Sequence, residues 1–148
     1  MTIPDLWSED IQIDVLPPVA ILRAQENPLG RKTKGILEAK VMTTTSESEA
    51  QHQLDLIAPA LSHYRKTLLT ARHSFEMVYP VEVRAPCFEP DGSMREFMLS
   101  KRNFAAGQED FIQVVRKVLQ STETKAIIQS LISRSNEIRS VLSTVEGK

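Results

Sequence analysis

The sequence predicts an α+β fold: an antiparallel meander sheet of about five strands, with an N-terminal helix and two C-terminal helices covering one face. Residues with strong β preference and alternating polarity are concentrated in the middle of the chain, between residues 36 and 101. Residues with helical spacing lie before and after this region, and strands and helices grouped in this way segregate into layers. The length of 148 residues matches one domain, so we expect a single domain over residues 1–148.

The N-terminal segment, residues 1–16, is expected to form an extended arm, because Pro4 and several acidic residues disfavour a helix there. Ile11, Ile13 and Val15 alternate with polar residues, and this alternation would also suit a short edge strand.

A helix is predicted to begin at Pro17 and Pro18, because proline fits the first turn, where its missing N–H would have no intrahelical partner. Pro28 is expected to kink or end this helix, since it removes a backbone hydrogen bond and clashes with the carbonyl four residues earlier. Gly30 would then be the C-cap, and the basic segment after it would lead into the sheet.

The strands are predicted from runs of β-forming residues that are separated by turn signals. They comprise residues 36–45, 52–58, 64–74, 78–85 and, after a turn at residues 89–93, 95–101. Pro80 falls within the fourth strand and should face away from a pairing neighbour, because it has no N–H to donate. Asp55 and Glu82 are assigned to an exposed polar face of the sheet, without a catalytic role.

Two helices are predicted after the sheet. Residues 107–120 place apolar side chains at helical spacing, with acids in the first turn and bases later, as the helix dipole favours. Residues 122–146 carry a heptad-type stripe in which Ser135 interrupts the apolar residues. This helix would be about 35 Å long, which exceeds the cover that the sheet needs. We therefore expect its C-terminal half to pack on another chain, through Ile128, Leu131, Ile138, Leu142 and Val145.

Composition indicates a soluble, cytoplasmic protein. The net charge of −1 gives no global attraction to nucleic acid or to an anionic membrane. A single cysteine excludes an intrachain disulfide and favours a reducing compartment. The N-terminal residues lack the features of a signal peptide, and no run of about 18 apolar residues predicts a membrane span.

The sequence predicts no catalytic residue, no metal and no cofactor, and it favours a non-enzymatic protein while leaving the question open. The segment 30–35, GRKTKG, lacks the order of a phosphate-binding loop, in which the second glycine is followed by Lys and Ser or Thr. His52, His63 and His73 are too widely spaced for a recognisable metal motif. Cys87 lies between two prolines, without a feature that would activate its thiol.

Two groups of residues remain as candidate sites. A pocket between the sheet and the helices could bind a small ligand through Tyr64, Arg72, His73 and Cys87. A basic sheet edge could contact nucleic acid, and its residues would be Arg31, Lys32, Lys34, Arg65 and Lys66.

Three short segments, LPPVAILRAQ, LIAPAL and YPVEV, resemble a group of small bacterial proteins with no assigned function. The resemblance covers about the middle two-thirds of the chain, and its motifs look structural. It implies a bacterial accessory protein and carries no activity, ligand or catalytic residue over to this sequence.

Three functions follow from these observations. The leading hypothesis is a non-enzymatic interaction or regulatory module that binds a partner protein or forms a homodimer through its C-terminal helix. The second is a nucleic-acid-associated protein that uses the basic edge. The third is a small-ligand binder or enzyme with a pocket between sheet and helices.

Overall fold

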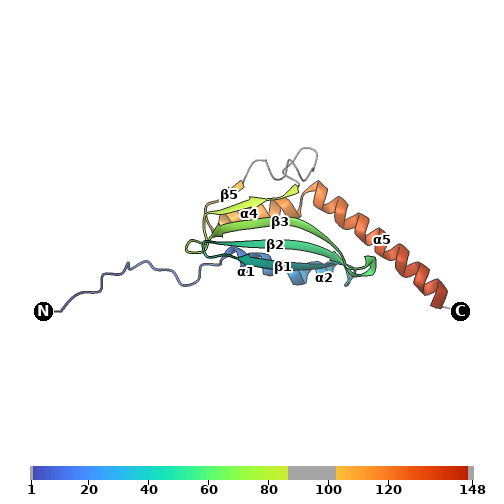
Figure 1. Cartoon of the computed structure of the whole chain (residues 1–148), viewed down its shortest axis with the longest axis horizontal. Helices are drawn as coiled ribbons and strands as arrows, with labels where there is room; N and C mark the ends of the chain where they lie inside the picture. Colours follow the sequence, from blue (N-terminus) through green and yellow to red (C-terminus); the bar gives the residue numbers. More distant parts are fainter. Residues whose placement is uncertain (1, 87–102, 147–148) are drawn as a thin grey trace.

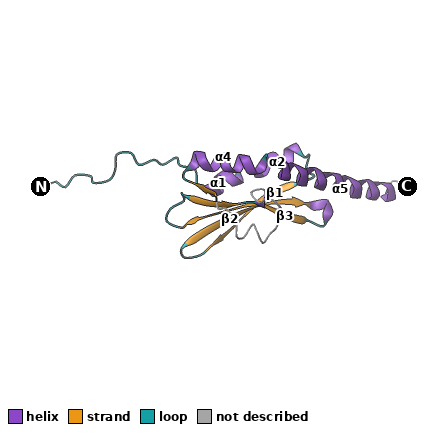
Figure 2. Cartoon of the chain, turned by 90° about the horizontal axis from the view of Figure 1, so that it is seen from above, coloured by secondary structure: helices purple, strands orange, loops and turns teal. Residues whose placement is uncertain are grey.

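The structure of the protein is a computed structural model that describes residues 2–86 and 103–146. Five antiparallel strands form one sheet in the order β1-β2-β3-β4-β5, so the predicted meander is confirmed. All helices lie on one face of this sheet, and the opposite face carries none within the described ranges (Figure 2). The predicted α+β class, with helices before and after the strands, is therefore correct.

Four of the strands overlap the predicted segments, and the fifth follows the last of those segments. They are β1 (Glu38–Thr45), β2 (Glu49–Ala58), β3 (Tyr64–Ser74), β4 (Val81–Arg84) and β5 (Asn103–Ala105). Pro80 lies outside β4 rather than within it, and its peptide bond with Tyr79 is cis. The strand expected at residues 95–101 and the turn before it lie outside the described residues.

The arm, residues 2–16, is extended and leaves the folded body, as Figure 1 shows at the N-terminal end. Every one of these side chains is exposed, and the edge strand considered for Ile11, Ile13 and Val15 does not form. The alternation of apolar residues was therefore not sufficient to predict pairing, because no strand of this chain adjoins the arm.

The N-terminal helix is divided into α1 (Pro18–Arg23) and α2 (Glu26–Lys32), so the break lies before Pro28 rather than at it. The proline ring excludes the carbonyl four residues earlier from the same helix, and that residue is Ala24, the C-cap of α1. Pro28 then occupies the first turn of α2, where no N–H is needed. The expected kink was thus placed four residues too late.

Gly30 lies inside α2 and is not the predicted C-cap. The helix ends in a Schellman motif instead, in which the N–H of Gly35 donates to the Gly30 carbonyl at 2.8 Å. The N–H of Lys34 donates to the Arg31 carbonyl at 3.3 Å, which completes the motif. Lys34 and Gly35 have φ values of 54° and 79°, and glycine adopts this region without steric cost.

Alternate residues of β2 face the helices, from Ala50 through Leu54 to Ala58, and they form the floor of the core. A β-bulge interrupts the β2–β3 ladder beside them. Leu54 pairs with Leu69, but Asp55 pairs with Thr67, so Leu68 is the extra residue. As a result, two consecutive leucines of β3, Leu68 and Leu69, are both buried.

The C-terminal helices are α4 (Gln108–Leu119) and α5 (Thr122–Glu146), and both match their predicted ranges. Ser121 joins them tightly: its hydroxyl oxygen accepts the Thr124 N–H at 3.1 Å, and its O–H donates to the Val118 carbonyl at 2.8 Å. The first half of α5 packs on the short 3-10 helix η1 (Pro59–Leu61), whereas the end of α5 projects beyond the sheet (Figure 1).

The two glycines at the end of α2 should respond oppositely to alanine. Gly30→Ala should stabilise the protein by up to about 1 kcal/mol, because alanine is the better helix former and its Cβ would meet open space. Gly35→Ala should destabilise it by about 1–2 kcal/mol, because its φ of 79° is unfavourable for a residue with a Cβ. Urea unfolding of both variants measures the difference, and equal effects would contradict the assigned roles.

Candidate functional site

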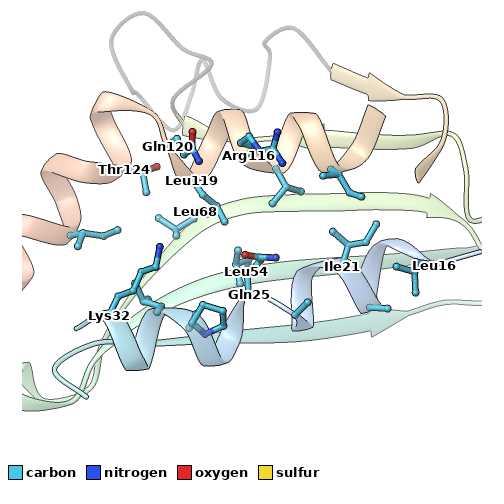
Figure 3. Close-up of a pocket in the computed structure, with 18 residues that line it drawn as sticks. Leu16, Ile21, Gln25, Lys32, Leu54, Leu68, Arg116, Leu119, Gln120 and Thr124 are labelled. Carbon is cyan, nitrogen blue, oxygen red and sulfur yellow. The ribbon is translucent and has the colours of Figure 1, made fainter. Parts of the chain in front are cut away.

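A cavity of about 560 Å³ lies between α1–α2 and α4–α5, above the sheet, and we call it the groove. Figure 3 shows Leu16 at one end of the groove and Lys32 and Thr124 at the other, with Leu54 and Leu68 between the helices. Its lining is mostly apolar. A volume of this size is typical of sites that bind ligands or side chains.

Small side chains create the hollow. Ala20 and Ala24 are four residues apart, so they share one side of α1, and Ala39 lies on the facing strand. The bulge places Leu68 at the floor beside Leu54. Larger residues at the alanine positions would fill the space, so the groove follows directly from the sequence of α1 and β1.

Positive charge lies beside this apolar lining. Lys32 of α2 and Arg116 of α4 both line the groove, and neither forms an ion pair with another described residue. Arg116 makes only a long hydrogen bond, 3.4 Å, to the side-chain oxygen of Gln113. Gln25 and Gln120 add neutral polar groups. The groove can therefore accept an apolar group that carries negative charge.

The residues predicted to line such a pocket do not form a common site. Tyr64 and His73 lie at opposite ends of β3, about 30 Å apart along the strand. Arg72 and His73 are consecutive, so they point to opposite faces of the sheet. None of these three lines the groove. Cys87 lies outside the described residues.

The sequence did not predict a buried pair of histidines, because His52 and His73 are distant in the chain. They come together on the helix-covered face, with their Nε2 atoms 2.9 Å apart. The other nitrogen of His73 contacts the Ser74 carbonyl at 2.8 Å, and a carbonyl only accepts, so that nitrogen carries the proton. Thr43 contacts Nδ1 of His52 at 2.9 Å.

Only one arrangement satisfies all three bonds when both rings are neutral. The Thr43 hydroxyl donates to His52, the Nε2–H of His52 donates to His73, and His73 donates to Ser74. Burial, the neighbouring His73 and the positive Arg23 lower the pKa of His52 from 6.5 to about 4.

This pair should make the protein less stable in mild acid. The pKa of His52 is lower in the folded than in the unfolded chain, so between pH 6.5 and 4 the unfolded chain binds more protons, and stability is lost as pH falls. We expect a loss of about 1–2 kcal/mol between pH 7.5 and 5, measured by urea unfolding. His52→Gln should flatten this dependence, whereas His63→Gln, at an exposed position, should leave it unchanged.

The acids assigned to an exposed face are in fact buried. Asp55 is 0% exposed and accepts hydrogen bonds from Thr67 Oγ1 at 2.8 Å and from Gln53 Nε2 at 2.9 Å. Arg65 lies 3.5 Å from its carboxylate. Thr67 stands opposite Asp55 because of the bulge. The exposed assignment was wrong because alternation identifies the face on which a residue lies but not what surrounds it.

Glu82 is likewise buried, and its two oxygens contact Arg72 at 3.2 Å and Arg84 at 2.9 Å. Asp55 and Glu82 therefore both have several polar partners on the face opposite the helices. This arrangement indicates a structural role, because each carboxylate is held by neighbouring strands rather than directed into a cavity.

The predicted basic patch is divided between surfaces. Its members all lie toward the end of the sheet where β1 begins and β3 begins: Arg31, Lys32, Lys34, Arg65 and Lys66. Arg65 faces away from the helices and pairs with Asp55, whereas Lys66 alternates to the helix side. Lys32 lines the groove. The five bases therefore do not form one continuous face.

The predicted interface on α5 contains residues of two kinds. Leu131 is buried in the core against Leu37 and Leu56, and Ile128 packs on the same cluster. These two residues are therefore not available to another chain, contrary to the expectation. Ile138 is 40% exposed and remains a candidate. The side chains of Leu142 and Val145 lie outside the described part of the chain.

Ser135 also differs from the expectation. It was interpreted as a polar position in an interface with another chain, but it is 0% exposed within this one. Its hydroxyl has no hydrogen-bond partner among the described residues. Val141, which the heptad pattern omitted, is 58% exposed and lies three residues from Ile138 on the same side of the helix.

Two further observations concern broad classes of site. Among residues 2–86 and 103–146, no group of three or more His, Cys, Asp or Glu side chains could hold a metal ion. No helix of the described chain combines the length and apolar character that crossing a membrane requires. Comparison with known proteins gives no matching family model, curated protein or solved structure.

Proposed function

We propose that this protein is a non-enzymatic interaction module that associates with a second copy of itself through the C-terminal half of α5. The observation that carries the proposal is the extension of α5 beyond its own domain. Ser135 is the last buried side chain of the helix among those described, yet the helix continues to Glu146. Those eleven residues add about 16 Å of helix.

A helical segment without tertiary packing is marginally stable in water, because most helical stability in proteins comes from an apolar face that packs. The projecting segment has such a face, since Ile138 and Val141 are adjacent on its surface and exposed. Packing this face on another helix would remove it from water and would stabilise the helix to its end.

The charges of the segment favour a second copy as the partner. Residues 136–146 contain Glu137, Arg139 and Glu146, so the segment carries both signs and a net charge of only −1. A twofold contact requires a surface that is complementary to itself. When two such helices pack antiparallel, acidic residues of one can approach basic residues of the other.

A single charge on the apolar face should weaken this association. Ile138→Glu would remove an apolar side chain from each of two copies and place two carboxylates in the contact. We expect the dissociation constant to rise at least about 100-fold. Sedimentation or light scattering of the full-length variant over a range of concentrations measures this change.

The matched control is Asn136→Glu, which adds the same charge on the opposite side of α5, at an exposed position. This variant should have the same dissociation constant as the unchanged protein. If Ile138→Glu and Asn136→Glu behave alike, or if the unchanged protein is monomeric at all concentrations, α5 is not the contact.

A further inference from the structure

The N-terminal arm is unusual because it is both exposed and apolar. Among residues 2–16, Trp7 is 79% and Ile13 is 98% exposed, and the other large apolar side chains are also open to solvent: Ile3, Leu6, Ile11, Val15 and Leu16. Contiguous apolar surface of this kind typically marks a site that another surface covers. The arm therefore has the character of a docking segment.

The arm and the groove complement each other in charge. The arm contains four acids, Asp5, Glu9, Asp10 and Asp14, and no base. The groove is apolar, and its charged lining residues are Lys32 and Arg116, which have no described ion-pair partners. In an extended chain Trp7, Ile11 and Ile13 share one side with Glu9, so a docked arm would bring apolar groups to the apolar lining and a carboxylate to the basic residues.

The two features also agree in length. The helical wall from Pro18 to Lys32 spans about 22 Å at 1.5 Å per residue. Seven residues of extended chain cover about 23 Å. Residues 7–13 would therefore occupy the groove and place Trp7, Ile11 and Ile13 in it. The remaining residues, 14–16, would connect this segment to the folded body.

The attachment of the arm favours the groove of another copy over its own. Leu16 is held at both backbone groups: its N–H donates to Gln108 Oε1 at 3.1 Å, and its carbonyl accepts the Tyr79 hydroxyl at 2.8 Å. Pro17 is extended, with φ −72° and ψ 161°. From Leu16 the arm runs outward, away from the folded body, rather than back over its own helices (Figure 1).

We propose that the arm of one copy docks in the groove of a second copy, with residues 7–13 in the apolar part and the acids near Lys32 and Arg116. This contact is separate from the α5 contact, because Ile138 and Val141 do not line the groove. Two different symmetric contacts on one chain produce assemblies larger than a dimer, either closed tetramers or open chains.

The protein contains its own reporter for this contact, because Trp7 is its only tryptophan. Trp7 is exposed in the free arm and would become buried in the groove. We expect the full-length protein at high concentration to show blue-shifted Trp7 emission and slow quenching by iodide and acrylamide. Dilution should shift the emission to that of exposed tryptophan, in parallel with dissociation of the assembly.

Variants of the arm and of the groove should both prevent docking. Ile11→Ser with Ile13→Ser removes apolar groups but retains Trp7, and Gln12→Ser, on the opposite side of the extended segment, is its control. Lys32→Glu should weaken docking about 10-fold, and more at low salt, whereas Arg31→Glu, outside the groove, should change it less than twofold. All five substitutions are at exposed positions and should leave folding intact.

Combining these variants with Ile138→Glu separates the two contacts. The unchanged protein should be larger than a dimer, the arm variant and the α5 variant should each be dimers, and the combination should be a monomer. An arm variant with unchanged mass would overturn the docking proposal and leave the α5 proposal intact. If Ile138→Glu alone left the mass unchanged, the α5 proposal would be overturned and the docking proposal would remain intact.

The dilution experiment distinguishes docking between copies from docking of the arm on its own chain and from no docking. Blue-shifted emission that is independent of concentration would show the arm folded onto its own chain, and exchange between copies would then be wrong. Emission of exposed tryptophan at every concentration would show that the arm does not dock at all. Only a shift that follows the concentration, and that Lys32→Glu moves to about 10-fold higher concentration, supports docking between copies.

Discussion

The β-bulge between β2 and β3 is the constraint on which the core and the groove both depend. It adds Leu68 to β3 opposite Leu54 and Asp55, so consecutive leucines are both buried. Leu69 joins the cluster under α1 and α4, and Leu68 joins the one under α5. The same extra residue brings Thr67 opposite Asp55 and provides a hydroxyl for a fully buried carboxylate. One inserted residue thus connects the two clusters and provides the buried Asp55 carboxylate, on the other face of the sheet, with a hydrogen-bond donor.

The general fold was predictable because its signals are local. Alternation identified β1 to β4, and the 3,4 spacing with charged ends identified α4 and α5. The errors arose where a residue acts at a distance along the backbone. Pro28 ended the preceding helix at Ala24, four residues earlier, and the C-cap of α2 is Thr33 rather than Gly30, with Gly35 completing the motif after it. The positions of Pro28 and Gly30 alone did not predict these effects, because the effects involve other residues several positions away.

The candidate sites were less predictable because they depend on which faces and ends of strands meet. Arg72 and His73 are adjacent in sequence but lie on opposite faces, whereas His52 and His73 are distant in sequence and hydrogen-bonded. Alternation along β3 separates the first pair, and the pairing of β2 with β3 brings the second pair together. This pairing contains a bulge that no turn residue in the sequence predicts. The spacing of Ala20 and Ala24 was the one sequence signal for the groove, because two small residues one helical turn apart leave a hollow beside a helix.

The contact between Glu26 and β1 has a consequence for how the sheet avoids uncontrolled growth. β1 is an edge strand, and an edge with unpaired backbone groups is a template for aggregation. The Glu26 carboxylate, from the first turn of α2, accepts the N–H of Val41 at 2.9 Å. A strand that approached this edge would have to displace a charged acceptor. The helix layer therefore protects this edge of the sheet against extension by further strands.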